Sequence, residues 1–342
     1  MKILYGIQGT GNGHITRGRA MAPRLSAAGH EVDFLFSGRP AAQYFDMECF
    51  GEYRAFTGLT LKINQGKLDY LGTTVGNSPL KFIADARSLN CQEYDQIITD
   101  FEPVTAWAGK NHIMGVLGIG HQYAFQHRIP LAGDNLAGRL VFRYFAPAKQ
   151  AIGLHWHHFD QPILPPILEA TESSADIDET LILVYTPSLS TQGLQELLVH
   201  HPDFHFHVYT GVDQPQRQQN VHLLPFSREG FQQDLRTAGG VICNAGFALI
   251  SEILTLGKKA LAIPLHGHME QLSNAAALQQ LNLMQTAPEL TPSTLSNWLK
   301  QSSATRIRFP DTAEQIVQRL TEGAPLDDMD WIQSVWKLVE YH

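Results

Sequence analysis

The first fourteen residues, MKILYGIQGTGNGH, hold the pattern that decides the fold. The apolar run KILYGI is typical of a buried parallel strand, and the glycines that follow favour a tight loop before a helix through Ala28. Such a loop lets backbone N–H groups and the positive end of a helix approach an anion closely. The dinucleotide fingerprint G-x-G-x-x-G would need a third glycine where this chain has His14, which disfavours a dehydrogenase.

Strand and helix patterns alternate along both halves of the chain. The first half has expected strands over 31–38, 94–100, 114–120 and 151–159 and helices over 103–112 and 135–151, while 51–80 supports no assignment. The second half has expected strands over 180–188, 204–211, 221–227, 240–246 and 258–265, with helices over 192–201, 229–238, 247–256 and 270–281. Alternation of this kind predicts two doubly wound α/β domains with parallel sheets.

Proline and acidic residues divide the chain. Residues 161–179 combine three prolines with small and acidic residues, so we expect an N-terminal domain over 1–160, a linker over 161–179 and a C-terminal domain over 180–327. Residues 328–342 are expected to form a final amphipathic helix, capped by Asp327 or Asp328, that could cross back to the first domain. Ligands of such sheets bind at the carboxyl ends of the strands, so the site is expected between the domains.

Net charge, hydropathy and cysteine content exclude several classes of partner and site. The 342 residues carry 25 basic and 33 acidic side chains, and the net charge of −8 argues against nucleic acid as a partner. No apolar run long enough to cross a membrane and no signal peptide are evident, so we expect a cytoplasmic protein. The three cysteines fit neither a disulfide framework nor a zinc site. Residues 135–151 interleave apolar and basic side chains; they either form a helix packed on the first domain or contact the inner membrane face or a lipid-linked acceptor.

Three side chains of the first half are candidates for acid–base chemistry. A histidine in the first turn of a helix, as His14 would be, suits a general base near neutral pH, although it could also only cap the helix. Asp100 and Glu102 follow an expected strand, and either carboxylate could orient the imidazole; alternatively, Asp100 caps the helix that begins near Pro103. His121 also follows a strand and could contact substrate.

The second half carries a candidate diphosphate site. In CNAGFALISE, Gly246 ends a strand and opens a helix, so the N–H groups of residues 246–249 could bind a diphosphate without a metal. Glu252 lies further along the same helix and could reach a ribose diol. Polar residues crowd the next strand end in HGHMEQLSNA, which suits the hydroxyl groups of a sugar.

These motifs together resemble the GT-B glycosyltransferases. GTGNGH, NAGFALISE and HGHMEQLSNA resemble the branch that contains the GlcNAc transferase making lipid II (family 28) and the UDP-glycosyltransferases. TDFEP and GIGHQYAF look more like an uncharacterised bacterial and archaeal group of that superfamily. The resemblance implies two facing Rossmann-like domains, the first for acceptor and the second for the nucleotide-sugar donor.

The resemblance also implies roles for individual residues. His14 becomes the catalytic base, with Asp100 or Glu102 behind it, and Gly11 and Gly13 line the loop facing donor and acceptor. The implied donor-binding residues are Thr186, Ser188, Phe226, Asn244, Gly246, Phe247, Ala248, Glu252, His268, Glu270 and Gln271. Asn244 departs from the lipid II enzyme, which has a basic residue there, so UDP-GlcNAc is not assumed.

The implied reaction is an inverting transfer from a nucleotide-sugar, typically a UDP-sugar, to a hydroxyl of a lipid-linked acceptor or a glycan. It requires no metal or other cofactor. Two alternatives remain open at this point: a nucleotide-sugar 2-epimerase of the same fold, and a nucleotide-sugar-binding protein without catalytic activity.

Overall fold

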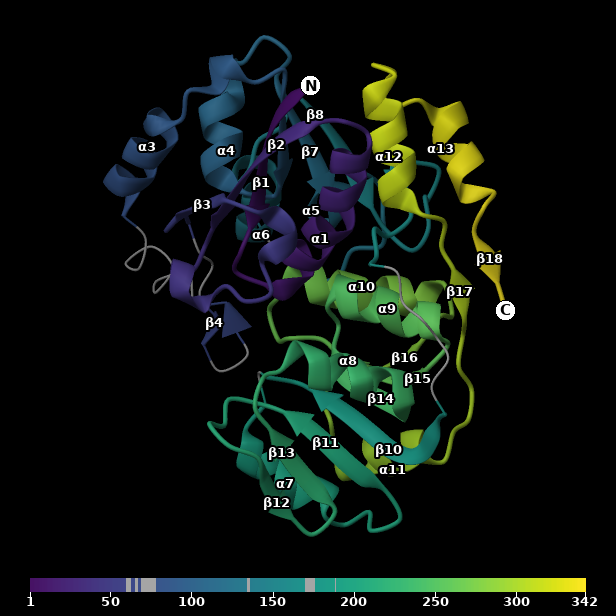
Figure 1. Ribbon diagram of the computed structural model, residues 1–342. Coiled ribbons are helices and arrows are strands. Elements are labelled where there is room, and N and C mark those ends of the chain that lie inside the picture. Colours follow the sequence, from purple (N-terminus) through teal and green to yellow (C-terminus); the bar gives the residue numbers. More distant parts are fainter. Residues whose placement is uncertain (60–62, 65–66, 69–77, 134–135, 170–175, 188) are drawn as a thin grey trace.

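The computed structural model describes residues 1–59, 63–64, 67–68, 78–133, 136–169, 176–187 and 189–342. The chain forms two α/β units, each built on a seven-stranded sheet. Figure 1 shows one unit above the other, with α9 and α10 at the boundary between the two sheets. The doubly wound α/β class expected from the sequence is therefore confirmed.

The first sheet has the order β3-β2-β1-β6-β7-β8-β9 and is parallel throughout. Its strands are β1 (Lys2–Gln8), β2 (Glu31–Ser37), β3 (Tyr53–Phe56), β6 (Gln96–Asp100), β7 (Val116–Gly120), β8 (Gln150–Leu154) and β9 (Ile163–Leu164). Its helices are α1 (Asn12–Ala27), α3 (Pro79–Ser88), α4 (Pro103–Ala108), α5 (His121–Ala124) and α6 (Leu136–Tyr144). Because β1, β6 and β7 are neighbours, the loops after them lie side by side.

The second sheet has the order β12-β13-β11-β10-β14-β15-β16, with β12 as an antiparallel edge. Its strands are β10 (Asp178–Tyr185), β11 (His205–Tyr209), β12 (Gln216–Gln218), β13 (Val221–Leu224), β14 (Ala238–Asn244), β15 (Lys259–Ile263) and β16 (Gln285–Thr286). Its helices are α7 (Thr191–Leu198), α8 (Arg228–Thr237), α9 (Phe247–Leu256), α10 (Met269–Gln280) and α11 (Pro292–Leu299). Helices α9 and α10 follow the adjacent strands β14 and β15.

Short elements complete the described chain. A small hairpin pairs β4 (Ile63–Asn64) with β5 (Lys67–Leu68), in the region that supported no assignment from sequence. Single 3-10 turns occur at Ala41–Gln43, Glu48–Phe50, Cys91–Glu93 and Gly109–Asn111. None of the helices in the described ranges is long and apolar enough to span a membrane.

Several expected boundaries differ from the structure; the strand expected over 151–159, for example, ends at Leu154. The helix expected over 135–151 ends at Tyr144, and residues from Gln150 onward form β8. Pro147 explains the early end, because proline cannot supply the backbone N–H that would continue the helix. The first sheet also extends into the expected linker, since Ile163 and Leu164 are fully buried in β9.

The C-terminal segment returns to the first unit earlier than at residue 328. After β17 (Ile307–Arg308), helix α12 (Thr312–Thr321) packs against α1, and Arg24 Nε donates to Asp311 at 2.9 Å. Helix α13 (Met329–Trp336), capped by Asp328, lies against β9, and the chain ends with β18 (Glu340–Tyr341) paired to β17. Figure 1 shows α12 and α13, in yellow, beside the upper sheet.

The two units are packed directly against each other. Trp156 Nε1 of the first unit donates to Ser251 Oγ of α9 at 2.8 Å, and both side chains are fully buried. The ring of His121 stacks on Phe247 with centroids 4.0 Å apart. One apolar cluster includes buried residues of both units. This shared packing fixes the position of one sheet's carboxyl edge relative to the other's.

Candidate functional site

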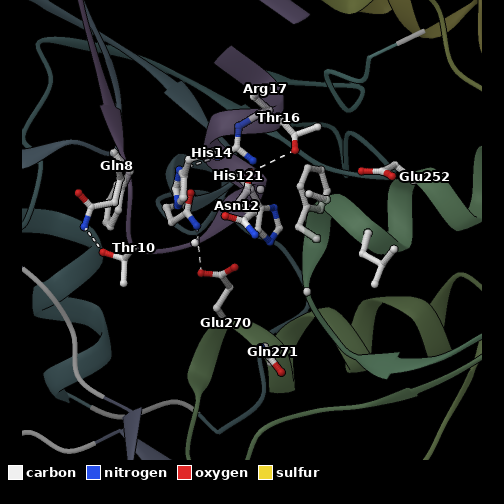
Figure 2. A pocket seen from close by; sticks show the side chains of 18 of the residues that line it. Gln8, Thr10, Asn12, His14, Thr16, Arg17, His121, Glu252, Glu270 and Gln271 are labelled. Atoms are coloured by element: carbon white, nitrogen blue, oxygen red, sulfur yellow. Dashed lines mark hydrogen bonds between the residues drawn. The ribbon is translucent and has the colours of Figure 1, made fainter. Parts of the chain in front are cut away.

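A cavity of about 460 Å³ lies between the two units. Both carboxyl edges contribute to it: Gly11, Gly13 and His14 from the first unit, and Gly246 and Glu270 from the second. Figure 2 shows His14 on the α1 side of this cavity, Glu270 below it and Glu252 at the far end. A volume of this order accommodates a small-molecule ligand.

His14 and Asp100 are brought together at the edge of the first sheet. His14, at the start of α1, places Nδ1 2.7 Å from Asp100 Oδ1 at the end of β6. Burial alone would raise the pKa of Asp100, but the charges of Arg17 and His14 outweigh it and hold that pKa below its usual range. With its proton on Nδ1, His14 donates to Asp100, which as an ionised carboxylate can only accept, and Nε2 keeps its lone pair. This is the tautomer that a general base requires.

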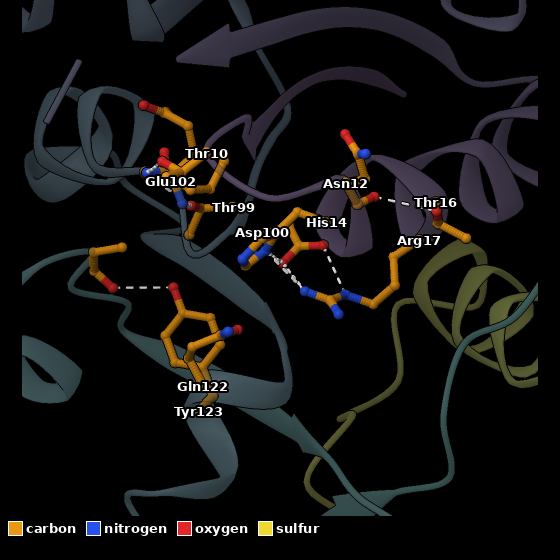
Figure 3. A network of polar contacts seen from close by, with 12 residues as sticks. Thr10, Asn12, His14, Thr16, Arg17, Thr99, Asp100, Glu102, Gln122 and Tyr123 are labelled. Atoms are coloured by element: carbon orange, nitrogen blue, oxygen red, sulfur yellow. Dashed lines mark hydrogen bonds and ion pairs between the residues drawn. The ribbon is translucent and has the colours of Figure 1, made fainter. Parts of the chain in front are cut away.

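Arg17 completes this group and was not among the residues singled out from the sequence. Its side chain is only 4% exposed, and it donates to both oxygens of Asp100, through Nε at 2.8 Å and Nη2 at 2.7 Å. Nη2 also lies 2.8 Å from His14 Nδ1. Figure 3 shows the three side chains converging. The spacing of three residues between His14 and Arg17 is the signal that could have identified it, because such residues share a helix face.

Glu102 does not support His14, contrary to one of the two expectations. Its carboxylate caps α4 by accepting from the backbone N–H groups of Val104 at 2.7 Å and Thr105 at 2.6 Å, and it also accepts from Ser37. Figure 3 shows Glu102 apart from the converging His14, Asp100 and Arg17 side chains. The cap expected from Asp100 is therefore made by Glu102, which frees Asp100 for the histidine.

The N-terminus of α9 forms the opposite wall. Gly246 is the N-cap of α9, and Gly246, Phe247 and Ala248 all line the cavity. A Cβ built at Gly246 meets nothing within 4 Å, so the space beside its backbone is open. Unsatisfied N–H groups and the helix dipole favour an anion at such a position. The arrangement can hold a diphosphate.

Gly13 allows helix α1 of the first unit to pack closely against helix α9 of the second. A Cβ at this position would lie 2.9 Å from the Cβ of Ala248 in the other unit, closer than methyl groups approach. A glycine is therefore needed for α1 and α9 to meet at this distance.

We expect Gly13→Ala to push α1 and α9 apart and to lower kcat/KM for the reaction of this site by about 10²-fold, the cost of a displacement near 1 Å. Steady-state kinetics would measure the loss. The double variant Gly13→Ala/Ala248→Gly removes the opposing methyl group and should recover most of the activity. Equal loss in the single and double variants would contradict the steric explanation.

Glu252 lies at the far end of the cavity beside a group of aromatic rings. It accepts from Gln232 Nε2 at 2.9 Å, and burial raises its pKa to about 7. Phe226, whose side chain is 56% exposed, and Tyr185 line the same end, with ring centroids 6.3 Å apart. A carboxylate next to exposed aromatic surface suits a ribose and its base.

A further group of polar cavity residues follows β15. His268 caps α10 by accepting from Gln271 N at 3.4 Å, and Gln271 Oε1 accepts from Leu265 N at 3.0 Å. Glu270 accepts from Gln122 Nε2 of the first unit at 3.1 Å, an interdomain contact that sequence reasoning missed. His268, Glu270 and Gln271 all line the cavity. Figure 2 shows the Glu270 carboxylate directed toward the His14 side of the cavity.

His121 lines the cavity, but it also joins the two units. It is fully buried, and its Nδ1 and Nε2 lie 2.8 Å from Leu154 O and Asn274 Oδ1. Both ring nitrogens of His121 therefore have hydrogen-bond partners within the protein. Neither is free for the substrate contact that the sequence analysis had expected. Burial lowers its pKa.

Two expected donor residues, Thr186 and Asn244, are not part of the described cavity lining. Thr186 is buried and is not part of the described lining, and Asn244 uses its amide to donate to Ile263 O at 2.9 Å across the sheet. Ser188 lies outside the described residues. The groups that the structure gathers at the cavity thus come mainly from the loops after β1, β14 and β15.

Known proteins share this architecture. The family model described as glycosyl transferase family 1 matches residues 1–302. An uncharacterized glycosyltransferase of Methanosarcina acetivorans is 26% identical over 322 residues, covering 82% of this chain and 81% of the relative. Among solved structures, the glycotransferase of kitacinnamycin aligns with a TM-score of 0.61 at 16% identity, over 98% of both chains.

The enzyme MurG of Acinetobacter baumannii aligns with a TM-score of 0.52 at 16% identity, over 98% of this chain and 100% of that one. Together with the two facing sheets, these likenesses show the GT-B fold. The family model spans most of the chain, and the resemblance seen in the sequence is confirmed. The chain is therefore a GT-B glycosyltransferase that belongs to glycosyl transferase family 1.

Proposed function

We propose that this enzyme transfers a sugar, with inversion, from a nucleoside diphosphate sugar of the UDP type to an acceptor hydroxyl. One observation carries the proposal: His14, oriented by Asp100, shares a single cavity with the open N-terminus of α9. The first can accept a proton and the second can hold a diphosphate.

The proposed reaction is a single displacement at the anomeric carbon. His14 Nε2 takes the proton of the acceptor hydroxyl while that oxygen bonds to the anomeric carbon. The bond from this carbon to the donor phosphate oxygen breaks, and the nucleoside diphosphate leaves with the bonding electrons. The N-termini of α9 and α1 would stabilise the growing negative charge, so the scheme uses no metal. Chelation with EDTA should leave the rate unchanged.

A ligand panel followed by a transfer assay tests this function. Among nucleoside diphosphates, the cognate one should raise the stability by about 2.7 kcal/mol at 100 times its Kd in thermal unfolding. With the matching nucleotide-sugar and an acceptor, proton NMR should show the opposite anomeric configuration in the product. Epimerisation of the nucleotide-sugar without acceptor, or binding without any turnover, would contradict the proposal.

Glu252 should make donor binding depend on pH. Its carboxyl ionises near pH 7 in the folded protein, so ribose hydroxyls meet a charged acceptor only above that pH. We expect the affinity for uridine diphosphate, measured by calorimetry, to rise between pH 6 and pH 8 by about ten-fold. Glu252→Gln should bind with a flat profile over this range, apart from the titration of the phosphate itself. A wild-type profile identical to that of the variant would contradict the ribose contact.

Ionisation of the Glu252 carboxyl should lower the stability of the folded protein, although it raises the affinity for the nucleotide. Because the folded-state pKa is raised, the folded protein holds this proton more tightly than the unfolded chain does. The stabilisation is therefore complete below about pH 4.5 and is lost as pH rises to about 7. Glu252→Gln should consequently stabilise the protein at pH 8 more than at pH 5, as thermal unfolding would show.

We also propose that α6 contacts an anionic lipid surface. Leu136, Leu140 and Tyr144 form one exposed stripe along α6, at 74%, 47% and 51% exposure, and Arg139 and Arg143 are exposed beside it. Apolar side chains flanked by arginines suit a membrane interface. The double variant Leu136→Ser/Leu140→Ser should lose most of its sedimentation with anionic vesicles, whereas Leu80→Ser, at an equally exposed leucine on α3, should not. Equal binding by all three proteins would contradict the contact.

A further inference from the structure

One buried amide oxygen in the cavity has no hydrogen-bond partner. Gln122 belongs to α5 of the first unit, is only 7% exposed and lines the cavity. Its Oε1 is buried and meets no donor among the residues that the structure describes. Buried acceptors in proteins are nearly always paired, because an unpaired one costs free energy. We therefore expect a ligand in the cavity to donate a hydrogen bond to this oxygen.

Glu270 determines which way the Gln122 amide faces. Burial acts to raise the pKa of Glu270, but His121, His268 and the Gln122 amide outweigh it and hold that pKa below its usual range. An ionised carboxylate can only accept, so the amide nitrogen must face it, and Nε2 donates to Glu270 Oε2 at 3.1 Å. Turning the amide over would bring two acceptors into contact. The oxygen is therefore the end of the amide that is left unpaired.

Gly120 keeps a space open beside the unpaired oxygen. A Cβ built at Gly120 would lie 3.6 Å from Gln122 Oε1 and 2.9 Å from Asp100 Oδ1, the oxygen that faces His14. The unpaired oxygen is thus close to the catalytic pair, and its own amide is bonded to Glu270. A side chain at position 120 would fill part of this space.

The chemistry of transfer decides which substrate group can donate to Gln122. The reacting acceptor hydroxyl has a single hydrogen, which His14 Nε2 takes in the proposed reaction, so it has none left for Oε1. The hydroxyls of the donor sugar keep their hydrogens throughout. A sugar whose anomeric carbon faces His14, and whose diphosphate lies at the N-terminus of α9, occupies the cavity that Gln122 and Glu270 line. Two acceptors held side by side suit two adjacent hydroxyls of a sugar ring.

We propose that Gln122 Oε1 accepts a hydrogen bond from a ring hydroxyl of the donor sugar, next to the hydroxyl that donates to Glu270. The enzyme then selects sugars that carry both hydroxyls, because a deoxy sugar leaves a buried acceptor unpaired. Gln122 belongs to the first unit and Glu270 to the second, so both units take part in selecting the donor. This inference rests on the proposed transferase function and names the class of sugar that its site accepts.

Donor analogues test this hydrogen bond. Transfer to water, the simplest hydroxyl acceptor, is measured as release of uridine diphosphate. The fastest of UDP-glucose, UDP-galactose and UDP-mannose is compared with the analogues that each lack one of its ring hydroxyls. In the wild type, removal of either of two adjacent hydroxyls should lower kcat/KM by roughly ten- to hundred-fold. Comparison of each ratio between the wild type and a variant cancels the intrinsic reactivity of the analogue.

Variants assign the two hydroxyls. Gln122→Met removes the amide at nearly constant volume and should abolish the discrimination at one carbon, whereas Glu270→Gln should weaken it at the adjacent carbon. The control Gln126→Met changes an exposed glutamine that does not line the described cavity, and it should keep the wild-type ratios. Gln122→Asn, which withdraws the same amide by one carbon, replaces Gln122→Met should that variant not fold. Wild-type ratios in the folded Gln122 variant would contradict the proposed contact.

Failure of this inference is distinguishable from failure of the proposed function. Turnover that is indifferent to Gln122, or a deoxy donor used in preference to all three hexoses, would overturn the sugar contact alone. The transferase function itself fails only if the protein turns over no nucleotide-sugar.

Discussion

Replacement of His14 by alanine is expected to lower kcat for sugar transfer by on the order of 10²–10⁴-fold, because the acceptor hydroxyl loses its general base. Affinity for the nucleoside diphosphate should stay nearly constant, since the proposed diphosphate site is at the N-terminus of α9 in the other unit. Single-turnover kinetics with calorimetry of nucleotide binding would measure both quantities.

A matched histidine provides the control. His200→Ala removes an exposed imidazole of the second unit that does not line the described cavity, and should leave kcat unchanged. If His14→Ala retains wild-type kcat, the base has been assigned to the wrong residue. If the variant instead loses nucleotide affinity in proportion to kcat, His14 acts in donor binding.

The second large effect is expected for Asp100→Asn, on both catalysis and stability. An amide can donate to His14 Nδ1 and stabilise the wrong tautomer, so kcat should fall on the order of 10²–10⁴-fold. The substitution also leaves the buried Arg17 guanidinium without its carboxylate, at a cost of about 3–5 kcal/mol in the free energy of unfolding. Transfer kinetics and denaturant unfolding measure the two effects.

A double variant separates these two roles. Arg17→Met/Asp100→Leu removes both buried charges, so its stability should exceed that of Asp100→Asn, while transfer should remain as low. Recovery of transfer together with stability would show that Asp100 serves only the fold. A single variant Arg17→Met should be less stable than the double variant, because it leaves Asp100 with only His14 as a charged partner.

The periodic apolar runs were sufficient to predict the architecture. Strand β1 is apolar on both faces and lies near the centre of a parallel sheet, so its burial dictates its conformation. Element ends were less predictable. The end of α6 depended on Pro147, whose effect competes with a continuing apolar period, and β9 is too short to show any period at all.

Site residues could be predicted only where a sequence motif by itself fixes their position relative to a strand and a helix. The glycine loop leads directly from β1 into α1, so His14 had to lie at the carboxyl edge. The choice between Asp100 and Glu102 could not be made from sequence, because it depends on the left-handed turn at Phe101. The buried role of His121 depends on Asn274, which is remote in sequence and comes from the other unit.

A crystal structure of the protein with its cognate nucleotide-sugar tests the central claim most directly. The account predicts the diphosphate at the N-terminus of α9, near residues 246–249, with the open face of the anomeric carbon directed toward His14 Nε2 and room for one acceptor oxygen between them. A nucleotide bound outside this cavity, or an anomeric carbon on the far side of the diphosphate from His14, would contradict it.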